Sequence, residues 1–220
     1  PDRYDKANVH CDVLVVGGGP AGLSAALEAG RAGARVILAD EQSELGGSLL
    51  AAGSAVNGAP ASEWVESAVA ELEAMEEARL LPRSTAFGYY DHNFVGIVQR
   101  VSDHLPPGAG AVPRQRLWRV RAKQVVLATG AIERPLVFHD NDRPGIMLAS
   151  AVSTYVNRFA VSPGSQAVVF TNNDSAYQAA LDLRQAGVAV STVVDLRPEP
   201  TGRLPGHVRQ HGIEVLAGHA

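Results

Sequence analysis

The pattern of apolar and polar positions at the start of the chain predicts a buried strand that leads into a helix. After a polar lead-in over residues 1–10, residues 12–16 read DVLVV, and a continuous apolar run is typical of a parallel strand buried on both faces. Residues 20–32 are rich in alanine and leucine and predict a helix, with a proline in its first turn and a glycine just beyond its end. Residues 35–39 predict the second parallel strand.

The next segment predicts a second helix and a third parallel strand. Ser62 is a candidate N-cap, and apolar side chains between Trp64 and Met75 fall on one helical face. Residues 79–81 then predict the strand that completes a right-handed β-α-β-α-β unit. Shorter strands follow and predict a small β-meander, over residues 85–90, 95–101 and 117–120.

Residues 124–131, QVVLATGA, predict a further buried strand that ends in small residues. Small residues at the carboxyl end of a strand leave room for a ligand at the edge of the sheet. We therefore expect Thr129 and Gly130 to face a bound cofactor, and the alternative is an ordinary strand end.

Beyond residue 133 the pattern restarts, which predicts a second domain. The loop over residues 133–145 contains two Arg-Pro pairs and is typical of a hinge or an inter-domain crossing. Further elements are predicted as a helix over 149–159, a strand over 166–170, a helix up to Ala186, a strand over 188–194 and a possible strand over 213–216. The sequence therefore predicts an α/β, Rossmann-like dinucleotide-binding fold of the FAD/NAD(P)-binding type. Residues 1–133 would form the dinucleotide-binding domain, and residues 134–220 a second, incomplete β-α-β unit.

Composition narrows the class of partner. The formal net charge of −4 disfavours nucleic acid or an anionic membrane as the main partner. The single cysteine cannot form an intramolecular disulfide, which fits a reducing, cytoplasmic compartment. No apolar stretch approaches the roughly eighteen residues of a membrane span, and the polar N-terminus does not read as a secretory signal. Because the chain has no initiator methionine and its second unit is short, we expect it to be a piece of something longer.

A glycine motif follows the first predicted strand at the spacing of a dinucleotide-binding turn, Gly17-x-Gly19-x-x-Gly22. In such a turn Gly17 allows the tight bend, Gly19 lets the backbone approach a pyrophosphate, and Gly22 lets the helix pack closely on the strand. The N–H groups and partial positive charge at the start of the helix attract the phosphate anion. Because the motif lies between a predicted strand and a predicted helix, it predicts dinucleotide binding rather than a plain turn.

Two further features extend the predicted site. Asp40 and Glu41 follow the second strand about twenty residues beyond the glycines, where an acid accepts hydrogen bonds from an adenosine ribose. Asp40, at the tip of the strand, is the better candidate, and an acid here disfavours NADP; the alternative is a solvated turn. Gly46, Gly47 and Ser48 come next and predict a loop whose backbone approaches the cofactor phosphates, or else a flexible loop.

Other kinds of chemistry find little support in the sequence. A disulfide reductase needs a pair of cysteines, and only Cys11 is present, ahead of the first predicted strand. His207 and His211 are four residues apart but lack the other ligands of a metal motif. The turn over residues 171–176 has no glycine, and its Asp174 would repel a pyrophosphate while capping the following helix. We expect this second unit to be empty, and the sequence offers no candidate catalytic residue or metal site.

Several longer stretches carry a family resemblance, namely CDVLVVGGGPAGLSAAL, VILADEQSELGGSLL, FGYYDHN and QVVLATGAIERPLVFHDNDRPGIMLASAVSTYVNR. They are similar to the two-dinucleotide-binding flavoprotein superfamily. More closely, the whole chain resembles the nucleotide-binding part of the alpha subunit of heterotetrameric sarcosine oxidase.

This resemblance implies a subunit of an oxidoreductase complex that oxidises sarcosine to glycine, with hydrogen peroxide and a folate-bound one-carbon unit as products. It implies beta, gamma and delta subunits as partners, FAD and FMN in the whole complex, and NAD in this chain, which alone would not be catalytic. By position, it implies that NAD lies on Gly17, Gly19, Pro20, Ala21, Gly22, Asp40, Glu41, Gln42, Gly47, Ser48 and the backbone at Ala86 and Phe87. The alternatives are an FAD-binding subunit of a related amine-, opine- or glycine-oxidising complex, and a non-catalytic nucleotide-binding scaffold.

Overall fold

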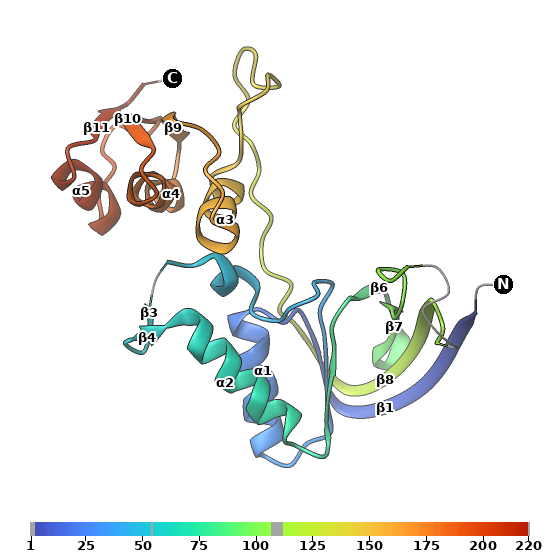
Figure 1. Cartoon of the computed structure of the whole chain (residues 1–220). Helices are drawn as coiled ribbons and strands as arrows, with labels where there is room; N and C mark the ends of the chain where they lie inside the picture. The colour runs from blue at the N-terminus through green and yellow to red at the C-terminus, as the bar shows by residue number, and fades with distance from the viewer. Residues whose placement is uncertain (1–2, 54, 107–111, 220) are drawn as a thin grey trace. The chain divides into compact units, whose positions relative to one another are not determined.

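The computed structural model describes residues 3–53, 55–106 and 112–219 (Figure 1). The chain divides into two compact units, residues 1–50 with 54–130, and residues 51–53 with 131–220. The functional boundary at residue 133 stays a prediction.

The first unit is built on a six-stranded sheet in the order β5-β2-β1-β8-β7-β6. Strands β5, β2, β1 and β8 are parallel, and β7 and β6 continue the sheet in antiparallel fashion. The strands are β1 (Tyr4–Val16), β2 (Val36–Ala39), β5 (Ala78–Leu81), β6 (Ser84–Tyr90), β7 (Phe94–Arg100) and β8 (Gln115–Leu127). Its other elements are α1 (Pro20–Arg31), α2 (Ala61–Glu73), the 3₁₀ turns η1 (Gly47–Ala51) and η2 (Asp91–Asn93), and the hairpin of β3 (Ala55–Val56) and β4 (Ala59–Pro60).

Successive residues of the central strand feed two separate cores. Val15 points toward the helices and packs with Leu23 of α1 and Leu72 of α2. Leu14 points to the opposite face and packs with Ile97 and other residues of the meander strands. A parallel strand buried on both faces is what the continuous apolar run predicts, and the α/β fold class predicted from the sequence is confirmed.

The strand β1 is longer than the sequence analysis predicts. It begins at Tyr4 and pairs with β8 from Tyr4 opposite Gln115 to Val16 opposite Leu127, so the expectation of a lead-in over residues 1–10 is wrong. The physical reason lies in the alternation of its first half, where Ala7 and Val9 pack on the core and the residues between them are exposed. Likewise, the two strands predicted over residues 117–120 and 124–131 are a single strand, β8.

Two local predictions need correction. Helix α2 begins at Ala61, so Ser62 lies inside the first turn and is not the N-cap; the N-cap position is occupied by Pro60, which makes no side-chain cap. Cys11 lies within β1 and is buried rather than preceding the first strand.

The second unit holds a three-stranded parallel sheet in the order β11-β10-β9. Its elements are α3 (Ala149–Phe159), β9 (Gln166–Thr171), α4 (Ser175–Gln185), β10 (Ala189–Asp195), α5 (Arg203–Gln210) and β11 (Glu214–Ala217). The sequence analysis missed α5, and the other elements lie where it predicts them within a few residues. The described residues 128–148 form neither helix nor strand.

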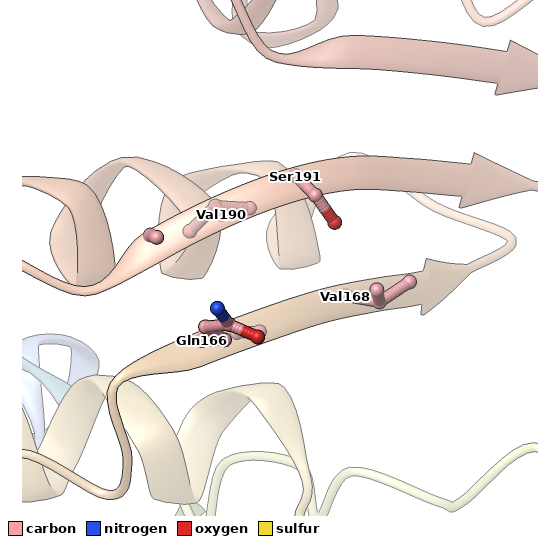
Figure 2. Close-up of a pocket in the computed structure, with 6 residues that line it drawn as sticks. Gln166, Val168, Val190 and Ser191 are labelled. Carbon is pink, nitrogen blue, oxygen red and sulfur yellow. The ribbon is translucent and has the colours of Figure 1, made fainter.

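One face of this small sheet packs on α4 and α5 through Val169, Val193 and Val208. The opposite face is open along β9, where Val168 is 63% exposed. A shallow hollow lies on these strands, lined by Gln166 to Val168 and by Ala189 to Ser191 (Figure 2). Its lining contains no ionisable side chain, so it offers nothing to hold a charged ligand. Within the described residues, no helix has the length and apolar character needed to cross a membrane.

Candidate dinucleotide-binding site

The glycine turn requires glycine at both of its ends. Gly17 has φ of +106°, and a Cβ there would overlap the carbonyl oxygen of Ala128. Gly22, in the first turn of α1, has no room for a side chain because its Cβ would overlap the carbonyl oxygen of Gly17. The strand, turn and helix are therefore packed against one another without side chains between them.

The middle glycine differs because it faces open space. The nearest atom to a Cβ on Gly19 would be the Cα of Gly47, at 3.9 Å. Gly19 is the N-cap of α1, and its carbonyl accepts the N–H of Leu23 at 2.9 Å to begin the helix. Pro20 follows as the first helical residue, and the N–H groups of Ala21 and Gly22 have no acceptor within the helix. This arrangement leaves a backbone surface with positive character where a pyrophosphate would lie.

The loop after β2 packs directly on the glycine turn. The N–H of Gly46 donates to the carbonyl of Gly18 at 2.8 Å. Gly47 has φ of +53°, and a Cβ there would lie 2.8 Å from the Cα of Gly19, so only glycine fits this approach. Ser48 is exposed in the next position, in η1. The structure thus brings the predicted phosphate loop beside the predicted phosphate turn.

Asp40 is a structural part of the turn. One oxygen of its carboxylate, Oδ2, accepts the N–H of Gly18, and Oδ1 accepts the N–H of Gln42 at 2.7 Å. A carboxylate oxygen has two lone pairs, so each oxygen can still accept a bond from a ribose hydroxyl. The Glu41 side chain is exposed, and its backbone carbonyl accepts a hydrogen bond from Nη2 of Arg100 at 2.7 Å.

Arg100 is a neighbour of the site that the sequence analysis missed. It lies at the end of β7, far from the motifs in the sequence, and it comes to Glu41 only because β6 and β7 fold back onto the end of β2. Pairing across a sheet edge leaves no local signal at either residue, so nothing in the sequence singles out this arginine.

The remaining predicted residues lie on two sides of the turn. The N–H of Ser84 donates to the carbonyl of Asp40 at 2.7 Å, which places Ala86 about 7 Å farther along β6. Phe87 lies at a register shift of that strand, and its ring covers Gly96.

On the other side, the backbone of Thr129 lies against Gly17, and the N–H of Ala128 donates to Val16 at 2.8 Å. Gly130 follows, exposed and with φ of +72°. The predicted residues of the glycine turn, the Asp40–Gln42 and Gly47–Ser48 loops and the Thr129–Gly130 turn therefore gather around the carboxyl ends of β1, β2 and β8. Ala86 and Phe87 lie farther along β6.

The turn of the second unit is filled by its own side chains. Arg197 donates from Nη2 to Asp174 at 2.8 Å and to Asp195 at 2.8 Å. Tyr177 also donates to Asp195, at 2.8 Å. Asp174 occupies the N-cap position of α4 but makes no capping bond; Asn173 accepts the N–H of Ser175 instead. The prediction that Asp174 caps α4 is therefore wrong, because its side chain accepts a hydrogen bond from Arg197 and none from the backbone at the start of α4.

Burial and ion pairing shift the pKa values in this cluster. Burial alone would raise the pKa of Asp195, but the hydrogen bonds from Arg197 and Tyr177 outweigh it and hold that pKa below its usual range. Burial, with the bond to Asp195, raises the pKa of Tyr177 to about 12. Asp195 and Arg197 thus stay charged at neutral pH, and each is paired with the other.

The candidates weighed for other chemistry are not assembled into a site. In the described part of the chain, no three His, Cys, Asp or Glu side chains lie together as a metal site would require. The rings of His207 and His211 pack against each other, 6.0 Å between centroids. Burial raises the pKa of the Cys11 thiol to about 11, so it is not a nucleophile at neutral pH.

Comparisons with known proteins agree with this geometry. A family model described as FAD dependent oxidoreductase matches residues 12–95, which include the glycine turn and Asp40. The sarcosine oxidase subunit alpha of Corynebacterium sp. (strain P-1) is 57% identical over 221 residues, 99% of this chain and 22% of that protein. The subunit of Rhizobium meliloti (strain 1021) is 51% identical over 90% of this chain and 20% of that protein. The chain is homologous to a segment of the sarcosine oxidase alpha subunit. It spans about a fifth of the length of these relatives.

Solved structures confirm the Rossmann-like fold. L-proline dehydrogenase from P. horikoshii superposes with a TM-score of 0.69 at 27% identity, covering 92% of this chain and 38% of that one. Thioredoxin reductase of Lactococcus lactis gives a TM-score of 0.67 at 18% identity, covering 94% of this chain and 64% of that one, which shows the fold alone.

Proposed function

We propose that the first unit binds NAD and that the chain is the nucleotide-binding part of the alpha subunit of a sarcosine-oxidase-type complex. The observation that carries the proposal is the open backbone surface at Gly19, flanked by Gly47 and Asp40, in a chain homologous to that subunit. In the complex, sarcosine would be oxidised to glycine, with hydrogen peroxide and a folate-bound one-carbon unit as products.

Different residues of the site would bind different parts of the cofactor. The start of α1, from Gly19 to Gly22, would hold the pyrophosphate together with Gly47 and Ser48. Asp40, Glu41 and Gln42 would meet the adenosine ribose. The backbone at Ala86 and Phe87 would meet adenine, and Thr129 and Gly130 would close the far side next to Gly17. NAD carries a nicotinamide that can exchange a hydride, but we propose that here it is held in a structural role. Residues 1–133 would be the nucleotide-binding domain.

The remaining steps would belong to partners. We propose that flavin chemistry takes place on a beta subunit, that gamma and delta subunits complete a heterotetramer holding FAD and FMN, and that the complex is cytoplasmic. Asp40 and Glu41 are the ionisable side chains among the site residues named above, and Asp40 is engaged with the backbone of Gly18 and Gln42, which supports a binding role for this chain.

FAD is the second candidate for the site, because the family model that matches residues 12–95 describes FAD-dependent enzymes. Both nucleotides share the adenosine and pyrophosphate that this turn would hold. They differ in the group beyond the second phosphate, which lies past the contacts that the turn provides.

The test is to purify the complete protein with its partners and to identify the nucleotides that it releases. NAD in a one-to-one ratio with the alpha subunit, lost in a Gly19→Ala variant while flavin is retained, is the expected result. If the Gly19→Ala variant loses FAD instead, the site is a flavin site. A native preparation that contains no dinucleotide associated with this chain would overturn the proposal.

A further inference from the structure

The start of the β6–β7 hairpin holds both ends of the loop that would meet the adenosine ribose. The carbonyl of Asp40 accepts the N–H of Ser84, the first residue of β6, at 2.7 Å. The carbonyl of Gln42 accepts the N–H of Arg83 at 2.8 Å. Arg83 has a positive φ of 56°, a conformation that is costly for a residue with a side chain. The chain therefore carries backbone strain at the point where the hairpin contacts this loop.

Glu41, in the middle of the loop, depends on a single side chain. In the part of the chain that the structure describes, the only hydrogen bond of Glu41 is the one that its carbonyl accepts from Nη2 of Arg100, at 2.7 Å. Its neighbour Asp40 is held independently, through its carbonyl and both of its carboxylate oxygens. Removal of the Arg100 side chain would therefore release Glu41 and leave Asp40 in place.

Arg100 is itself fixed by the same hairpin. It is the last residue of β7, where it lies opposite Gln115 of β8, and its N–H donates to the carbonyl of Arg83 at 2.9 Å. The guanidinium group is planar and directs each N–H along a defined line. A residue anchored in the sheet thus sets the orientation of an exposed residue in the loop.

We propose that Arg100 is a positioning residue for Glu41 and orients the Glu41 carboxylate toward the hydroxyl groups of the adenosine ribose. The proposal rests on the function proposed above, in which this loop meets the ribose. NAD and FAD share that ribose, so the proposal applies to either nucleotide. Both residues are exposed and water competes for the bond, so its loss should weaken recognition of the ribose hydroxyls by about threefold to tenfold.

Arg121 offers a matched control within the first unit. It is also exposed, and its Nη1 also donates to a backbone carbonyl, that of His92 at 3.4 Å. It lies opposite Phe94, at the other end of β7 from Arg100. Arg100→Ala and Arg121→Ala therefore remove the same charge and the same kind of hydrogen bond, but only the first touches the loop.

The experiment compares the binding of ADP with that of 2′,3′-dideoxy-ADP, in the complete protein with its partners and after exchangeable nucleotide has been dialysed away. The two probes carry the same base and phosphates and differ only in the ribose hydroxyls. The ratio of their dissociation constants therefore reports the hydroxyl contacts and is insensitive to the charge removed from the protein. Glu41→Ala and the double variant Glu41→Ala/Arg100→Ala would be measured in the same way.

The native protein should bind ADP more tightly than the dideoxy analogue. Arg100→Ala should lower this preference by about threefold to tenfold, Arg121→Ala should leave it unchanged, and Arg100→Ala should cause no further loss in the Glu41→Ala background. A native preference in Arg100→Ala, or equal losses in the two arginine variants, would overturn the proposal alone. If the native protein binds both probes equally, the proposed ribose contacts fail as well, and if it binds neither, the proposed function fails.

Discussion

At the scale of single residues, the glycines of the turn are present for two different reasons. Two of them are required by the packing of the backbone, and one leaves space for a ligand. Gly17 and Gly22 are required by the fold, because a side chain at either position would overlap backbone. Gly19 is not required by the fold, because a Cβ there has no neighbour closer than 3.9 Å and its φ of −75° suits any residue. A glycine at a position where the fold has room for alanine fits a turn that must leave space for a ligand.

Alanine substitutions should therefore give opposite results at these two positions. We expect Gly17→Ala to lower the free energy of unfolding by about 3 kcal/mol or more, since it adds strain at a positive φ to a backbone overlap. Gly19→Ala should change it by less than about 1 kcal/mol but weaken dinucleotide binding at least tenfold. Denaturant unfolding and calorimetric titration would measure the two effects, and a stable, tightly binding Gly19→Ala protein would contradict this account.

The Asp40 side chain would serve both the fold and the ligand. Its carboxylate accepts the backbone N–H groups of Gly18 and Gln42 before any ribose is present. The neighbouring Glu41 uses only its backbone carbonyl in the described contacts, for Arg100.

We expect Asp40→Ala to lower both nucleotide affinity, by about 1–3 kcal/mol, and the melting temperature of the nucleotide-free protein. Glu41→Ala should leave that melting temperature within about 2 °C, and any loss should appear only in affinity. Melting curves without nucleotide, compared with binding isotherms, separate the roles. If Asp40→Ala melts like the native protein, its bonds to the turn are not stabilising.

At the scale of elements, the first half of β1 shows how a polar strand is overlooked. Lys6, Asn8 and His10 are exposed, while Ala7 and Val9 face the core. Alternation of this kind was present in the sequence, but the inward residues are small and few. The evidence that settles it is the pairing with β8, more than 100 residues away, which no local pattern contains.

A matched pair of substitutions tests this pairing. Val9→Asp would place a carboxylate in the core and should lower the free energy of unfolding by about 2–4 kcal/mol. Asn8→Asp, on the exposed face of the same strand, should change it by about 0.5 kcal/mol or less. Chemical denaturation of both variants gives the comparison, and equal effects would mean that residues 4–10 are not packed as a strand.

The Tyr177–Asp195–Arg197 cluster ties α4 to β10 and makes the second unit sensitive to pH at both extremes. The pKa of Asp195 is lowered by folding, so its contribution to stability is full above the unfolded value near 3.8 and is lost as the pH falls through the lower, folded value. The pKa of Tyr177 is raised from 10.0 to about 12, so its contribution is full below pH 10 and is lost as the pH rises toward 12.

Two substitutions should test the two sides of this pH dependence. Relative to the native protein, Tyr177→Phe should flatten the loss of stability between pH 10 and about 12. It should also reduce the loss on the acid side, because the Tyr177 hydroxyl is one of the donors that lower the pKa of Asp195. Asp195→Asn should flatten the loss below about pH 4, at the cost of lower stability at neutral pH, because Arg197 loses its buried partner. Unfolding followed as a function of pH measures both. Identical alkaline profiles for the native and Tyr177→Phe proteins would contradict the assignment.

At the scale of the whole molecule, the sequence predicts what is encoded locally. The buried apolar run, the glycine spacing, Asp40 and the order of most elements all follow from short-range patterns. Contacts between distant segments do not. The approach of Gly47 to Gly19, the bond from Arg100 to Glu41 and the filling of the second turn by Arg197 each depend on strand order, which a single sequence leaves open.

Cys11, the only thiol of this sequence, lies inside β1 at 3% exposure, five positions before the end of the strand that leads into the glycine turn. A thiol reagent such as an aromatic disulfide can react with it only when the sheet opens locally. The rate of Cys11 labelling therefore reports how often the sheet opens. A dinucleotide at a hundred times its dissociation constant should lower the labelling rate by about a hundredfold if opening of the sheet releases the ligand. Mass spectrometry of the Cys11 peptide would follow the reaction, and labelling that is fast and indifferent to nucleotide would show that the strand opens independently of the site it supports.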